Sequence, residues 1–70
     1  MEKLADVVNN LIDSGMTEQA IADRLEKLGV AVAQSTIHRI KSGEIEQPKF
    51  DVGIALLKLR DQMARSRASA

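Results

Sequence analysis

The spacing of the apolar residues constrains the fold of this chain more than any other feature of its sequence. Near the start, five of them recur at intervals of three and four residues, as on one side of a helix: Leu4, Val7, Val8, Leu11 and Ile12. A second set has similar helical spacing: Ile21, Ala22, Leu25 and Leu28. Runs in which apolar and polar residues alternate, which would indicate strands, are missing. The sequence therefore predicts an all-α fold, a small bundle of about four or five helices.

Glycine and capping residues indicate where the first two helices begin and end. Gly15 and Gly29 follow the two apolar sets, and glycine suits the left-handed conformation that closes many helices. Thr17 is a suitable N-cap for a second helix over about 18–28. The next segment, VAVA at 30–33, could continue this helix or form an extended connector. Its β-branched valines and the preceding glycine favour the connector.

Two further helices are predicted in the second half of the chain. Ile37 and Ile40 lie three residues apart, so a helix over about 34–42 would turn both inward. A loop over about 44–50 follows, and Asp51 is a suitable N-cap for the last helix. One side of that helix is apolar: Val52, Leu56, Leu59 and Met63.

Ile54 and Leu57 lie off this apolar side of the last helix. They indicate either an unusually wide core face or a patch for a second copy of the chain, and the patch is slightly favoured. The final segment, RSRASA at 65–70, has no apolar anchor. We therefore expect a single domain over residues 1–64, followed by a disordered basic tail.

Composition excludes several classes of site. The chain has no cysteine and one histidine, so neither a disulfide framework nor a thiolate or multi-histidine metal site is expected. A Gly-rich phosphate loop and a His–carboxylate constellation are also missing, so we expect no enzyme and no cofactor. No apolar run approaches the roughly 18 residues of a membrane span, and the first residues do not resemble a secretory signal. We expect a cytoplasmic protein without a membrane partner.

Charge is unevenly distributed along the chain. The net charge is zero, which argues against a protein that coats nucleic acid generally. However, residues 1–33 hold three cations against six anions, a net charge of −3, whereas residues 34–70 hold seven cations against four anions, a net charge of +3. This asymmetry predicts a local electropositive surface in the second half of the chain.

Two segments carry a resemblance to a known family. MTEQAIADRL at 16–25 and QSTIHRIKSGE at 34–44, followed by Pro48, resemble the helix-turn-helix of phage Cro and C1-type (λ repressor-like, XRE-type) repressors. The resemblance covers roughly residues 16–60, and its most specific part comprises Gln34, Ser35, Thr36 and Ile37, then Ile40 and Gly43. It implies a λ repressor-like bundle of helices that binds operator DNA, commonly as a homodimer.

The spacing within the motif departs from that family. Ala22 and Gln34 are twelve residues apart, more than is usual between the corresponding family positions. An alternative register would keep Gly29 as the glycine of the turn. It would bury the hydroxyl of Ser35 and expose Ile37, so we reject it.

The resemblance, with the chemistry of base edges, assigns roles to individual residues. Because the N-terminal part of a recognition helix lies nearest the bases, we expect base contacts from four residues: Gln34, Ser35, His38 and Arg39. An amide such as that of Gln34 can pair with adenine N6 and N7, and a guanidinium such as that of Arg39 with guanine O6 and N7. Phosphate contacts are expected from Thr17, Gln19, Thr36, Lys41, Ser42 and Lys49. The expected dimer interface consists of Ile45, Phe50, Ile54 and Leu57.

Glu18 is the chemical departure from the family, which often has glutamine directly after this threonine. We expect an anion at position 18 to repel the DNA backbone, so Gln19 is assigned the phosphate contact instead. Glu44 and Glu46 similarly stand where the family often has cations. Affinity through phosphates is therefore expected to be modest.

Two functions from different classes follow. The first is a small transcriptional regulator, a Cro/C1-like repressor that contacts the major groove of a near-palindromic operator with the helix at about 34–42. It would bind double-stranded DNA as a homodimer, formed in solution or only on DNA, and without a small-molecule ligand. The alternative is a protein-interaction module, antitoxin-like or regulatory, that keeps the helix-turn-helix fold but binds DNA weakly or not at all.

Overall fold

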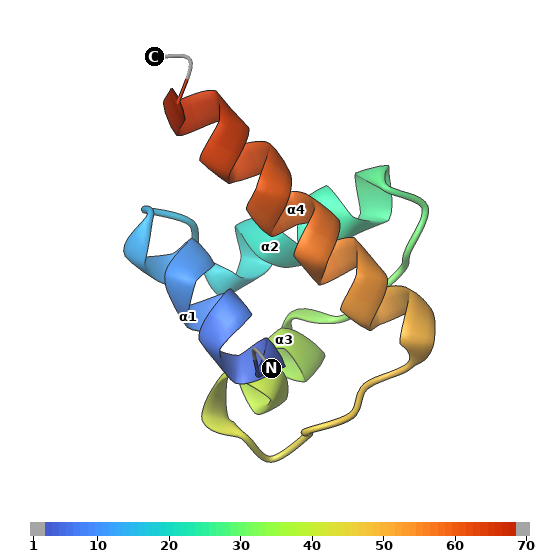
Figure 1. Cartoon of the computed structure of the whole chain (residues 1–70). Helices are drawn as coiled ribbons and strands as arrows, with labels where there is room; N and C mark the ends of the chain where they lie inside the picture. Colours follow the sequence, from blue (N-terminus) through green and yellow to red (C-terminus); the bar gives the residue numbers. More distant parts are fainter. Residues whose placement is uncertain (1–2, 69–70) are drawn as a thin grey trace.

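The computed structural model describes residues 3–68 and folds them into four helices without a strand. In chain order these are α1 (Leu4–Asp13), α2 (Glu18–Lys27), α3 (Gln34–Ser42) and α4 (Phe50–Ala68). Both α3 and α4 pack against α1 and α2 (Figure 1). The all-α class predicted from the apolar spacing is therefore confirmed.

The core between these helices is aliphatic. Its buried residues come from every helix and from the connector after α2: Val7, Val8, Leu11, Ile21, Ala22, Leu25, Val30, Ile37, Ile40, Val52, Ala55, Leu56 and Leu59. Among the described residues, no polar or charged side chain is buried with them. Ile37 and Ile40 are fully buried and Ser35 is exposed, which confirms the register predicted for α3. One side of α3 is thereby anchored in the core, and the opposite side faces solvent.

A Schellman motif closes α2 and separates it from α3. Gly29 has a φ of +90°, the left-handed conformation that glycine adopts easily. Its N–H donates to the carbonyl of Glu26 at 3.0 Å, and the N–H of Val30 donates to the carbonyl of Leu25 at 2.9 Å. Val30 and Leu25 are also both buried in the same aliphatic core, and apolar residues often occupy these two positions of the motif. The segment 30–33 is therefore a connector, as its valines indicated.

The last helix departs from the prediction at both ends. It begins at Phe50, so Asp51 lies in its first turn and is not the N-cap. The Asp51 carboxylate still accepts a hydrogen bond from the N–H of Val52 at 2.9 Å, at the end of the helix where an anion is favourable. At its other end the helix continues to Ala68, past the domain boundary at residue 64. Residues 65–68 are thus helical where a disordered tail was expected, and the last two residues of that tail lie outside the described part.

Candidate nucleic-acid interface

The solvent-facing side of α3 carries the four side chains expected to contact bases. Gln34, Ser35, His38 and Arg39 are all exposed, and the side chains of His38 and Arg39 keep 60% and 57% of their surface accessible. Each residue turns the helix by about 100°, so these four lie opposite the buried Ile37 and Ile40. The structure therefore brings together, on one convex surface, the residues that the sequence assigned to base contact.

This surface divides into two rows along the helix axis. Gln34, His38 and Lys41 follow one another at intervals of four and three residues and lie on the side of α3 toward the start of α2, because all three contact Glu18. Ser35, Arg39 and Ser42 form the neighbouring row. We call the first set the Glu18-bound row, since its members share that one carboxylate.

Glu18 is the first residue of α2, and its carboxylate accepts from all three members of the Glu18-bound row. Its Oε1 lies 3.3 Å from Gln34 Nε2, and its Oε2 lies 2.8 Å from His38 Nδ1 and 3.3 Å from Lys41 Nζ. Only 17% of the Glu18 side chain is exposed. Three donors from one helix thus converge on a single anion at the start of another.

The hydrogen bond from His38 is the main reason why the pKa of the Glu18 carboxyl lies below its ordinary value. The hydrogen bonds from Lys41 and Gln34 lower this pKa further, and partial burial acts in the opposite direction. At neutral pH, Glu18 is therefore an ionised carboxylate that can only accept hydrogen bonds.

Sequence reasoning missed these contacts of Glu18, whose expected effect at the interface was to repel the DNA backbone. The available signal was the four- and three-residue spacing of Gln34, His38 and Lys41, which places their donors in one row of a helix. That the row faces position 18 depends on how α2 and α3 cross, and the spacing does not specify this crossing.

The residues expected to contact phosphate are more dispersed. Thr17 caps α2, because its Oγ1 accepts from the N–H of Ala20 at 3.0 Å as predicted for an N-cap. Gln19 donates to Asp23 Oδ1 at 2.9 Å on the exposed surface of α2. Both residues flank Glu18 at the end of α2 that approaches α3.

The remaining residues expected to contact phosphate lie on α3 and in the loop after it. They differ in exposure and in whether they already have a hydrogen-bond or ion-pair partner. Thr36 is half-buried, and the Ser42 hydroxyl donates to the carbonyl of Arg39 at 3.1 Å. Lys41 keeps 33% of its side chain exposed while its ammonium pairs with Glu18. Lys49 is exposed but lies directly before α4, and so belongs to neither α2 nor α3.

Arg39 also has an acidic neighbour. Its Nε lies 3.6 Å from Glu44 Oε2, and both side chains are more than half exposed. An exposed pair at this distance contributes little to stability, so it costs little to break when another partner approaches Arg39.

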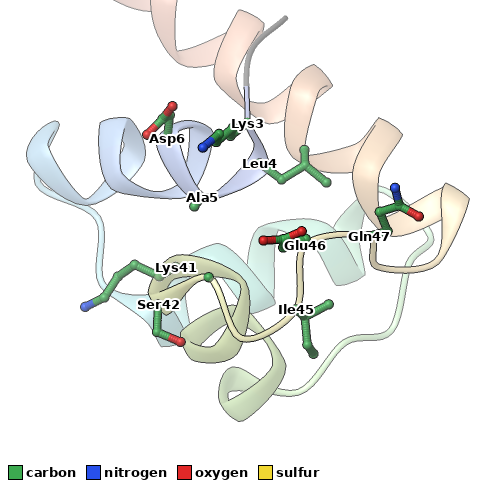
Figure 2. Close-up of a pocket in the computed structure, with 10 residues that line it drawn as sticks. Lys3, Leu4, Ala5, Asp6, Lys41, Ser42, Ile45, Glu46 and Gln47 are labelled. Atoms are coloured by element: carbon green, nitrogen blue, oxygen red, sulfur yellow. The ribbon is translucent and has the colours of Figure 1, made fainter.

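A groove of about 730 Å³ adjoins the C-terminal end of α3 and is lined by the start of α1 and the loop after α3 (Figure 2). Its charges are mixed, since two cations and two anions line it: Lys3, Lys41, Asp6 and Glu46. In Figure 2 the Lys41 side chain extends away from Glu46, in keeping with its pairing to Glu18. Within residues 3–68, no group of three or more His, Cys, Asp or Glu side chains is placed to hold a metal ion.

A second feature of the surface is apolar. Phe50, Ile54 and Leu57 lie four and three residues apart on α4 and are exposed by 83%, 36% and 37%. We call these three residues the α4 patch. Two residues of the patch, Phe50 and Ile54, line a groove of about 320 Å³. The other residues that line it are Leu28, Val30, Asp51, Ala55 and Lys58. Ile45, the fourth residue of the expected dimer interface, is instead half-buried and packs against the core.

None of the described helices is both long enough and apolar enough to cross a membrane. Comparison of the chain with family models, with curated proteins and with solved structures found no match. The resemblance to phage repressors therefore rests on the residues of the chain.

Proposed function

We propose that this protein binds double-stranded DNA sequence-specifically, with α3 in the major groove, and acts as a small transcriptional regulator of the Cro/C1 repressor kind. The observation that carries the proposal is the outward face of α3. It presents an amide, a hydroxyl, an imidazole and a guanidinium on one exposed side of a helix whose opposite side is anchored by two fully buried isoleucines. These are side chains that pair with base edges, and a rigid helix holds them in a fixed register.

The electrostatics support modest affinity. Lys41 is paired with Glu18 and Arg39 with Glu44, so two cations near the candidate interface are partly neutralised before DNA arrives. Phosphate contacts dominate the affinity of most proteins for DNA. Binding by this protein should therefore depend on base contacts more than is usual, and should fall less steeply with salt.

The same proposal includes a homodimer formed through the α4 patch. A two-fold pair can bury Phe50 of each copy against the other copy, because Phe50 lines an apolar groove together with Leu28 and Val30. Asp51 and Lys58, of opposite charge, also line that groove and can pair across the axis. Such a dimer would place its two copies of α3 in successive major grooves of a near-palindromic operator, in the bacterial cytoplasm.

The first test of the function is selection from random duplex DNA at moderate salt. We expect enrichment of a near-palindromic motif with half-sites about one helical turn, roughly ten base pairs, apart. Arg39→Ala should relax the preference at one position of each half-site. Arg24→Ala, which removes the same charge from an exposed position on α2, should leave the motif unchanged.

The dimer has a separate test. Burying a phenylalanine contributes about 1.5–3 kcal/mol, so Phe50→Ser should raise the dimer dissociation constant at least about tenfold in sedimentation experiments. The fold should survive, because Phe50 is 83% exposed in the single chain. Ala64→Ser changes another exposed position of α4 and serves as the control. Equal dissociation constants for Phe50→Ser and the wild type would exclude the α4 patch as the interface.

The second candidate is a protein-interaction module that does not bind DNA. The α4 patch favours it, together with the neutralisation of Lys41 and Arg39 by acidic neighbours. No enriched motif and no salt-sensitive retention on DNA would support this candidate over the regulator.

A further inference from the structure

We propose that Glu18 is a specificity-determining residue: it holds hydrogen-donating nitrogens of Gln34 and His38, and so presents their acceptor atoms to bases that carry an amino group. The inference rests on the proposed function, because it concerns which bases α3 accepts. It also has a part that can be tested without DNA.

The first step concerns the imidazole of His38. Glu18 Oε2 lies 2.8 Å from His38 Nδ1, and an ionised carboxylate has no hydrogen to donate. The proton of this hydrogen bond must therefore be on Nδ1. In an isolated neutral histidine, by contrast, the proton is mostly on Nε2. In the neutral ring, Nε2 is then unprotonated and accepts hydrogen bonds. Nε2 lies on the far edge of the ring from Glu18, and the side chain is 60% exposed.

The second step concerns the amide of Gln34. Its Nε2 donates to Glu18 Oε1 at 3.3 Å, because the amide oxygen in the same place would meet a negatively charged oxygen. The orientation of the amide is thus set, with the nitrogen toward Glu18 and Oε1 away from it. Gln34 and His38 are one helical turn apart on the Glu18-bound row, and both present a free acceptor.

The third step follows from the chemistry of the major groove. Adenine presents an amino group there at N6 and cytosine at N4, whereas guanine and thymine present only acceptors. Guanine or thymine opposite these two atoms would leave acceptor facing acceptor. Each base pair joins one such base to thymine or guanine, so the Glu18-bound row selects the orientation of the pair. At two nearby positions of each half-site, the strand that the row contacts carries adenine or cytosine.

Lys41 contributes to this arrangement without contacting a base. Its ammonium lies 3.3 Å from the same Oε2 that accepts from His38, so it favours the ionised, acceptor-only form of Glu18. The charge of Glu18 has a second consequence. It lies beside the expected path of the DNA backbone, so removing it should strengthen binding to all sequences while selectivity falls.

The experiment combines imidazole ¹⁵N NMR of the free protein with DNA selection, both at about pH 8.5. The proteins are wild type, Glu18→Ala, Glu18→Gln and the control Glu26→Gln, which removes the same charge from an exposed position near the other end of α2. Gln34→Ala and His38→Ala identify the base position that each side chain contacts, since each should lose preference at one position only.

We expect Nδ1 of His38 to be protonated in the wild type, and Nε2 in Glu18→Ala. We also expect the base preference at the two mapped positions to fall about fivefold or more in Glu18→Ala and to be unchanged in Glu26→Gln. Glu18→Gln, which keeps an acceptor but loses the charge, should bind all sequences more tightly and keep part of the preference.

The outcomes distinguish failure of this inference from failure of the proposed DNA binding. If the wild type enriches a motif but Glu18→Ala enriches the same one, or if Nε2 carries the proton in the wild type, the inference is overturned and DNA binding stands. If the wild type enriches no motif, the proposed function and the inference fall together.

Discussion

Replacement of Ile37 by valine tests the register on which the candidate interface depends. Ile37 is fully buried, and the change removes one methylene group from a well-packed aliphatic core. Such a truncation costs about 0.5–1.5 kcal/mol, whereas truncation to alanine costs about 2–5 kcal/mol. A 70-residue domain has a total stability of only about 4–10 kcal/mol at roughly 0.05–0.15 kcal/mol per residue, so the milder change is the safer probe.

This loss of unfolding free energy converts into a fall in the melting temperature, Tm. In a domain of this size, 1 kcal/mol corresponds to about 4–8 °C, so Ile37→Val should lower the Tm by about 2–12 °C. Urea unfolding followed by circular dichroism measures the same loss as a shift in midpoint without a change in slope. Ser35→Ala is the matched control on the exposed side of α3, and should change stability by no more than about 0.5 kcal/mol.

The two variants also separate stability from function. Ser35→Ala should alter the selected DNA motif, because Ser35 lies on the expected base-contacting face. Ile37→Val should leave the motif unchanged, because that side chain never reaches solvent. The reverse pattern, with a stable Ile37→Val and a Ser35→Ala destabilised by more than about 1 kcal/mol, would refute the register of α3 and with it the candidate interface.

Three other predictions concern the helix interior, the Glu18 carboxylate and the cations of α3. Gly53 lies inside α4, and a Cβ there would meet Leu4 Cδ1 at 3.5 Å, which is an ordinary contact. Gly53→Ala should therefore raise the free energy of unfolding, measured in urea, by about 0.5–1 kcal/mol. A loss of stability would contradict this packing. The folded-state pKa of Glu18 is lowered, so its contribution to stability is complete above the ordinary glutamate pKa of about 4.3 and declines as pH falls below it. Wild type should thus lose more stability than Glu18→Gln on acidification, and equal pH profiles would show that these contacts do not form in solution. Lys41→Ala should weaken binding to all sequences alike and reduce the salt slope by at most about one, while Arg39→Ala should change base preference; the opposite result would mean that Lys41 contacts a base and Arg39 a phosphate.

Local signals in the sequence predicted most of the helix boundaries. Thr17 can cap only the residues that follow it directly, and Gly29 closes α2 through bonds that reach no further back than Leu25. Both interactions span a few residues, so a short stretch of sequence contains all the participants. The end of α4 was misjudged because the prediction considered only packing against the core, for which residues 65–70 offer no apolar anchor. Helical hydrogen bonds are local, however, and no glycine or proline follows Gly53 to interrupt them.

The sequence by itself determined the helical fold, the inward turn of Ile37 and Ile40, and hence the exposure of the four residues expected to contact bases. Helical periodicity is enough for this, because a helix buries its apolar side whatever it packs against. Only the tertiary structure decided that Glu18 meets Gln34, His38 and Lys41, residues that lie 16 or more positions away along the chain. It likewise decided that Ile45 packs on the core while Phe50 stays exposed. These outcomes depend on the angle at which two helices cross and on the course of a loop, and both are set by how the whole core packs.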